Sequence, residues 1–164
     1  WSKSSEFLKL LDVPRRAGVT VELALALDDE PTAALLERSG FRVVPARPLS
    51  RDPGAYRAFI TASGGEFTAA KDQNVRLRSG WFSDRTAAYL ATGRPTVVQD
   101  TGFDISLPTG DGLLAFRTTE EAVECLQRVA GDYERHSRAA HAIAVEHFRA
   151  ETVLERLLGE AGLG

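Results

Sequence analysis

The chain has 164 residues, of which 43% are hydrophobic and 26% charged, and its formal net charge is −3. This length suits one domain with a full hydrophobic core, and the absence of a basic excess argues against a nucleic-acid-binding protein. No apolar run approaches the roughly 20 residues that a membrane span requires, and the N-terminal residues lack the order of a signal peptide. The single cysteine, Cys125, excludes an internal disulfide and favours a reducing, cytoplasmic location.

The sequence contains no methionine, and it begins with Trp1. Because translation starts with methionine, we expect the chain to be a fragment of a longer protein. The order of elements agrees with this expectation, since the first predicted element is a helix where a doubly wound domain would start with a strand.

Strands and helices are predicted to alternate along the first hundred residues. Serines precede an amphipathic helix over residues 4–11, and a β-branched, apolar strand follows over residues 19–27. A proline near its start and a glycine after its end delimit a helix over residues 31–39. The next predicted elements are a strand over 41–44, a helix over 53–63, a strand over 66–69, a helix over 86–92 and a strand over 96–99.

The last third is predicted to be mainly helical. After a short strand over residues 113–116, Thr118 and Glu121 form a capping box that starts a helix reaching Ala130. Helical patterns follow over residues 132–148 and 151–158, and we expect these C-terminal helices or one face of the sheet to expose apolar surface.

The alternation of strands and helices predicts the fold class. Parallel strands joined by right-handed crossovers form an α/β, Rossmann-like, doubly wound sheet, here followed by the C-terminal helices. Residues 19–27 and 96–99 are expected to be central strands with helices on both faces, because both are too apolar to face water.

The stretch from residue 79 to residue 112 carries the most functional information. Ser83 is expected to cap the following helix, Gly93 and Pro95 to end it, and the next strand leads into a polar loop at Asp100. A helix that begins beside a glycine-containing turn offers backbone N–H groups and a positive dipole end to a phosphate.

This order of elements resembles the donor-binding half of a GT-B glycosyltransferase, and the resemblance runs from about residue 66 to residue 158. The matching positions are Gly80, Ser83, Gly93, Pro95, Asp100 and Gly102. The resemblance implies a single domain over residues 1–164 that binds a nucleotide sugar without a cofactor or metal. It also implies that a missing N-terminal domain holds the acceptor, that the isolated chain is inactive, and that the catalytic residues remain unidentified.

One departure from the family pattern limits what the resemblance implies. Many retaining members carry two glutamates that flank the helix start, where this chain has Gly80 and Ala88. The resemblance therefore supports the fold and a phosphate cradle more than any particular sugar or stereochemical outcome.

We predict that a nucleotide diphosphate binds at the turn over residues 80–85. The backbone N–H groups of residues 83 to 85 would hold the phosphates, a nearby cation would neutralise them, and the loop after the next strand would face the sugar. Arg85 is a cation at a positive helix end, which a phosphate or Asp84 would compensate. The predicted donor-binding residues are Lys71, Arg78, Gly80, Ser83, Asp84, Arg85, Asp100 and Thr101.

Each of these residues also has a purely structural interpretation, as a solvated surface cation, a helix cap or an ordinary turn residue. Two other functions therefore stay open. One is a non-catalytic Rossmann-like domain that has lost its ligand. The other is a flavodoxin-like interaction module, whose acidic cluster would be Asp28, Asp29 and Glu30.

Other motifs argue against further classes. Neither a G-x-G-x-x-G nor a Walker sequence occurs. The spacing of the three histidines, at residues 136, 141 and 147, misses the single helix face that a metal site uses, so we expect them to be exposed or lightly packed. Cys125 is expected in the core, and Trp81 and Phe82 are expected to pack beneath the turn.

Overall fold

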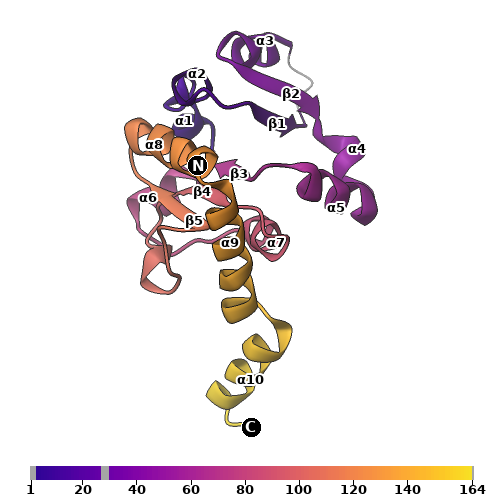
Figure 1. The fold of residues 1–164 in the computed structure, drawn as a ribbon, viewed down its shortest axis with the longest axis vertical. Coiled ribbons are helices and arrows are strands. Elements are labelled where there is room, and N and C mark those ends of the chain that lie inside the picture. The colour runs from indigo at the N-terminus through magenta and orange to yellow at the C-terminus, as the bar shows by residue number, and fades with distance from the viewer. Residues whose placement is uncertain (1–2, 27–29, 164) are drawn as a thin grey trace.

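The computed structural model describes residues 3–26 and 30–163 and has an α/β fold (Figure 1). Its strands form two sheets, one of two strands and one of three, and every pairing within them is parallel. The predicted fold class is therefore confirmed, and the parallel strands with intervening helices are compatible with a Rossmann-like fold.

The first part of the chain forms the smaller sheet. In this sheet β1 (Val21–Leu25) pairs with β2 (Phe41–Pro45), with Val21 opposite Phe41 and Leu25 opposite Pro45. The helices of this part are α1 (Ser4–Leu8), α2 (Val13–Ala17), α3 (Glu30–Arg38), α4 (Ala46–Ser50) and α5 (Pro53–Ala62). The short helices α2 and α4 were not predicted.

The second part forms the larger sheet, with the strand order β3-β4-β5. Its strands are β3 (Glu66–Thr68), β4 (Thr96–Gln99) and β5 (Leu113–Phe116), joined by α6 (Asp72–Arg76), α7 (Asp84–Ala91) and the 3-10 turn η1 (Phe103–Ile105). Three helices complete the chain: α8 (Thr119–Gly131), α9 (Tyr133–His147) and α10 (Ala150–Glu160).

Helices cover both faces of the larger sheet, and β4 is buried throughout its length. On one face Val97 packs in a cluster with Val123 and Cys125 of α8. On the other face Val98 packs with Leu90 of α7 and Ile143 of α9. The expected core position of Cys125 is confirmed, and its burial raises the pKa of the thiol.

The prediction that residues 19–27 and 96–99 are strands of one sheet is wrong. β1 belongs to the smaller sheet and spans residues 21–25, while residue 27 lies outside the described residues. Apart from Val21, the side chains of β1 are not fully buried, and Glu22 pairs with Arg42 of β2 across the sheet. The alternation of Glu22 with apolar neighbours is typical of a half-exposed strand, and the prediction gave it too little weight.

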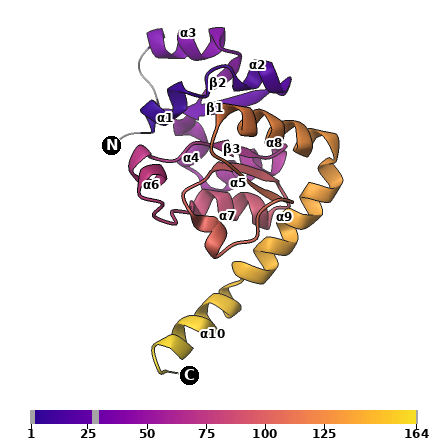
Figure 2. The same ribbon diagram turned by 90° about the vertical axis from the view of Figure 1, so that its left-hand side faces the viewer.

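The last helix extends away from the rest of the fold (Figures 1 and 2). All of the described residues of α10 are exposed, and its apolar side chains at Val153, Leu154, Leu157 and Leu158 face solvent. The apolar surface expected on the C-terminal helices is therefore present. Among residues 3–26 and 30–163, none of the helices is both long and apolar enough to cross a membrane.

Candidate functional site

The turn before α7 and the loop after β4 are joined at the carboxyl end of the larger sheet. The backbone N–H of Gly80 donates to the carbonyl oxygen of Thr101 at 2.8 Å. In return, the Thr101 hydroxyl donates to the carbonyl oxygen of Trp81 at 2.6 Å. The structure therefore brings together two of the segments that the sequence analysis assigned to one site.

Asp100 forms the ionic centre of this edge. Its buried Oδ2 accepts hydrogen bonds from Arg78 Nη1 at 3.0 Å and from Arg117 Nε at 2.6 Å, and its Oδ1 accepts the Gly102 N–H at 2.7 Å. Burial alone would raise the pKa of Asp100. The donated hydrogen bonds from Gly102, Arg117 and Arg78 outweigh it and hold that pKa below its ordinary value.

The two guanidinium groups that meet at Asp100 remain open to solvent. The side chain of Arg78 is 50% exposed and that of Arg117 is 62% exposed. Asp104 approaches Arg78 Nη2 at 3.5 Å and Arg117 Nη2 at 3.9 Å, and so balances the second positive charge. Arg78 has a φ of 45°, the single positive φ outside glycine in the described chain, which marks a strained backbone at this edge.

Arg117 was missed by the sequence analysis. It is the first residue after β5, at the same sheet edge as Asp100, which follows β4. A search for charged residues directly after each predicted strand would have found it, because the carboxyl ends of parallel strands meet at one edge.

The start of α7 differs from the predicted cap. Ser83 occupies the N-cap position, but its hydroxyl caps no backbone N–H and instead bonds Asp84 Oδ1 at 3.3 Å. Asp84 Oδ1 also accepts the Arg85 N–H at 2.8 Å. Of the three N–H groups expected to hold phosphates, one is thus already bonded to a carboxylate. Asp84 takes this role because its negative charge is favoured at a helix N-terminus.

Arg85 turns away from the helix start and toward β3. Its Nε lies 2.5 Å from Glu66 Oε1, and its Nη2 donates to Thr68 Oγ1 at 2.9 Å. Glu66 is buried, and its Oε2 has no hydrogen-bond partner among the described residues. The charge that compensates Arg85 is therefore Glu66, rather than a phosphate or Asp84. Sequence reasoning missed this because the two residues come from different elements.

Two further predicted residues are placed less favourably for a ligand at this edge. Thr101 is completely buried, so only a rearrangement of the turn would let its side chain reach a sugar. Lys71 precedes α6 and is exposed, and its charge acts on Lys3 near β3.

The aromatic residues of the turn separate into two environments. Phe82 packs between Phe103 and Phe148, with ring centroids 5.4 and 5.5 Å away. The expectation of packing is confirmed for Phe82. It is wrong for Trp81, which is 53% exposed beside Gly80.

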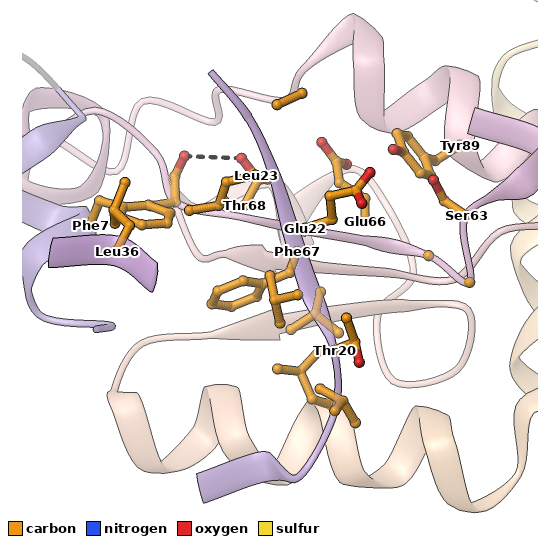
Figure 3. Close-up of a pocket in the computed structure, with 18 of the residues that line it drawn as sticks. Phe7, Thr20, Glu22, Leu23, Leu36, Ser63, Glu66, Phe67, Thr68 and Tyr89 are labelled. Carbon is orange, nitrogen blue, oxygen red and sulfur yellow. Dashed lines mark hydrogen bonds between the residues drawn. The ribbon is translucent and has the colours of Figure 1, made fainter. Parts of the chain in front are cut away.

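Two cavities adjoin these elements. A smaller one, of about 310 Å³, lies at the strand-end edge and is lined by Gln99, Arg117 and Thr118 among others. A larger cleft, of about 810 Å³, lies between β1 and β3. Figure 3 shows Glu66, Thr68 and Tyr89 on one side of β3 and Phe67 on the other.

The remaining sequence candidates are the acidic cluster and the histidines. Asp28 and Asp29 lie outside the described residues, and Glu30 starts α3. His136 is buried rather than exposed or lightly packed, and its Nδ1 accepts the Gly112 N–H at 3.1 Å. Within the described parts of the chain, no three His, Cys, Asp or Glu side chains are grouped so that they could hold a metal ion.

Comparisons of the chain with protein-family models, with curated proteins and with solved structures found no match.

Proposed function

We propose that the chain is the nucleotide-sugar-binding domain of a glycosyltransferase and that the diphosphate binds at the carboxyl edge of the larger sheet. The observation that carries the proposal is the junction of the Gly80 turn with the loop after β4, where Gly80 N–H meets the Thr101 carbonyl. Ligands of open α/β sheets bind outside the carboxyl ends of strands, where such loops converge.

Arg78 and Arg117 would supply the positive charge for a leaving diphosphate. Both guanidinium groups are fixed through the same buried oxygen of Asp100, so they are held side by side before a ligand arrives. Each guanidinium has five N–H donors, and most of these remain available on the exposed side. Preorganised donors of this kind stabilise developing negative charge without a metal ion.

The N-terminus of α7 would bind the phosphate once the Asp84 carboxylate has moved away from the Arg85 N–H. A phosphate at the N-terminus of α7 would replace the Asp84 carboxylate on the Arg85 N–H. The Arg85 guanidinium would stay on Glu66, so Arg78 rather than Arg85 is the cation expected to contact the diphosphate.

The test is calorimetry of the full chain with UDP, GDP and dTDP at up to millimolar concentration. Arg78→Ala should weaken binding by about 1–3 kcal/mol, the contribution of a charge-assisted hydrogen bond. Arg156→Ala on the exposed helix α10 is the matched control and should leave binding unchanged. If none of the three nucleotides binds, the proposal fails.

A non-catalytic domain is the second candidate. The Asp84 carboxylate on the Arg85 N–H favours it, because a negative charge stands where a phosphate is expected. This candidate predicts that the three nucleotides leave the melting temperature of the chain unchanged, even for an Asp84→Asn variant.

A further inference from the structure

The cleft lies between the two sheets, and its lining includes β1 of the smaller sheet and β3 of the larger one. Its volume of about 810 Å³ is within the range of small-molecule sites.

The two sides of β3 give the cleft an amphipathic lining. Glu66 and Thr68 are two residues apart and point to one side, while Phe67 points to the other (Figure 3). On the Phe67 side, Val97 of β4 and Val129 of α8 continue an apolar wall. A ligand that spans the cleft therefore meets polar groups at one end and an aliphatic and aromatic wall along the rest.

Lys3 and Arg85 supply hydrogen-bond donors at the polar end of the cleft. Lys3 Nζ and Arg85 Nη2 both donate to Thr68 Oγ1, at 3.4 and 2.9 Å. An ammonium group has three donors and a guanidinium five, so both retain donors for a ligand. The Glu66 oxygen that Arg85 does not bind is buried beneath the surface.

Both of the described carboxylates that line this end are paired with an arginine. Glu66 is matched by Arg85 and Glu22 by Arg42 of β2, which leaves the ammonium of Lys3 in excess, with Lys71 nearby. Partial burial lowers the pKa of Lys3, repulsion from Arg85 and Lys71 lowers it further, and the attraction of Glu66 offsets part of this lowering. An acid group placed among these cations would relieve that repulsion.

We propose that this cleft binds a small amphipathic anion, with an apolar body between β1 and β3 and a carboxylate or phosphate group on Lys3 and Arg85. The site is separate from the strand-end edge around Asp100. The inference does not depend on a glycosyltransferase function.

The test uses four ligands with the same ten-carbon chain below their micelle concentrations: decanoate, decyl phosphate, decanol and decyltrimethylammonium. Calorimetry of the full chain should show that one or both anions bind at least tenfold more tightly than decanol and the ammonium ligand. Whichever anion binds more tightly identifies the head group. In ¹H–¹⁵N spectra, the shifts caused by that anion should centre on Leu23, Phe67 and Arg85.

Two variants separate the head group from the body. Lys3→Gln should weaken binding of the anion about tenfold and leave decanol unaffected, the effect of losing roughly one charge-assisted hydrogen bond. Leu23→Trp fills the cleft from β1 and should weaken all four ligands, with the fold checked by circular dichroism. Arg156→Gln on α10 is the control and should change nothing.

Three results would overturn the proposal. The first is equal binding of anionic, neutral and cationic ligands, and the second is binding that survives both Lys3→Gln and Leu23→Trp. The third is displacement of the anion by UDP, GDP or dTDP, because it would make the cleft the nucleotide site. If no nucleotide binds but the anions do, the proposed function alone fails.

Discussion

Arg85 of α7 and Glu66 of β3 form an ion pair with an Nε–Oε1 distance of 2.5 Å. The Glu66 side chain is only 4% exposed, whereas that of Arg85 is 38% exposed. Breaking such a pair from the cationic side leaves a buried charge without compensation. Arg85→Ala should therefore lower the free energy of unfolding by about 3 kcal/mol, measured by urea denaturation.

The partner variant provides the control for this prediction. Adding Glu66→Gln to Arg85→Ala removes the uncompensated charge, so the double variant should be more stable than Arg85→Ala alone. A double variant that is less stable than the single one would show that the charge on Glu66 is not what Arg85 compensates.

Asp100 should make the stability of the chain depend on acid pH. The folded-state pKa of Asp100 is lowered, so its contribution is fully present above the unfolded-state pKa of about 4 and is lost as the pH falls through the folded-state pKa. Urea denaturation between pH 7 and pH 3 should show stability falling below about pH 4. Asp100→Asn should make this fall less steep, and it should lower stability at pH 7 by about 1–3 kcal/mol. Asp104→Asn removes a more exposed carboxylate, so it should change the acid-dependent fall and the stability at pH 7 much less.

Gly112 should not tolerate a side chain. Its φ is +75°, and a β carbon there would overlap the backbone of Ala139 and Ala140 in α9. Gly112→Ala should therefore cost at least about 3 kcal/mol, because the added carbon would meet helix backbone rather than the end of a flexible side chain. Gly131→Ala, where no atom lies near the added carbon, should be neutral or stabilise by up to about 1 kcal/mol. Thermal unfolding would compare the two, and similar melting temperatures would contradict the close approach.

Arg117 should contribute to nucleotide binding as Arg78 does. If the strand-end edge holds a diphosphate, Arg117→Ala should weaken binding by about 1–2 kcal/mol, as a charge-assisted hydrogen bond is lost. Arg117→Lys should recover only part of the lost affinity, because an ammonium cannot hold Asp100 and a phosphate in the same planar geometry. Unchanged affinity in both variants, with nucleotide binding intact, would restrict the diphosphate site to the Gly80 turn.

Local sequence signals predicted the elements whose boundaries depend on nearby residues. The Thr118 hydroxyl accepts the Glu121 N–H at 3.1 Å, as the capping box indicates, although the Glu121 carboxylate bonds the N–H of Arg117 rather than that of Thr118. Gly93 adopts a φ of +68° where α7 ends. Strands β4 and β5 have the predicted bounds, because both contain short β-branched or apolar segments that are stable when buried in a parallel sheet.

The features that the sequence did not predict depend on residues that are far apart in the chain. Glu66 reads as part of a short strand, and its role follows only from the position of Arg85 on another element. His136 reads as a surface histidine, and its burial follows from the close approach of Gly112 to α9. The approach of Gly80 to Thr101 is different, because the helix start, the strand-end loop and the family resemblance together placed these two distant segments at one site.

The division of the strands between two sheets implies that the chain opens in two stages. β4 is hydrogen-bonded to a strand on each side, whereas β1 is paired on one side, with β2. Among the described residues, the buried members of the cluster that holds this pair are Val21, Leu36 and Phe41. Amide protons of β1 and β2 should therefore exchange with solvent through a partial opening of lower free energy, while those of β4 exchange only when the whole molecule unfolds.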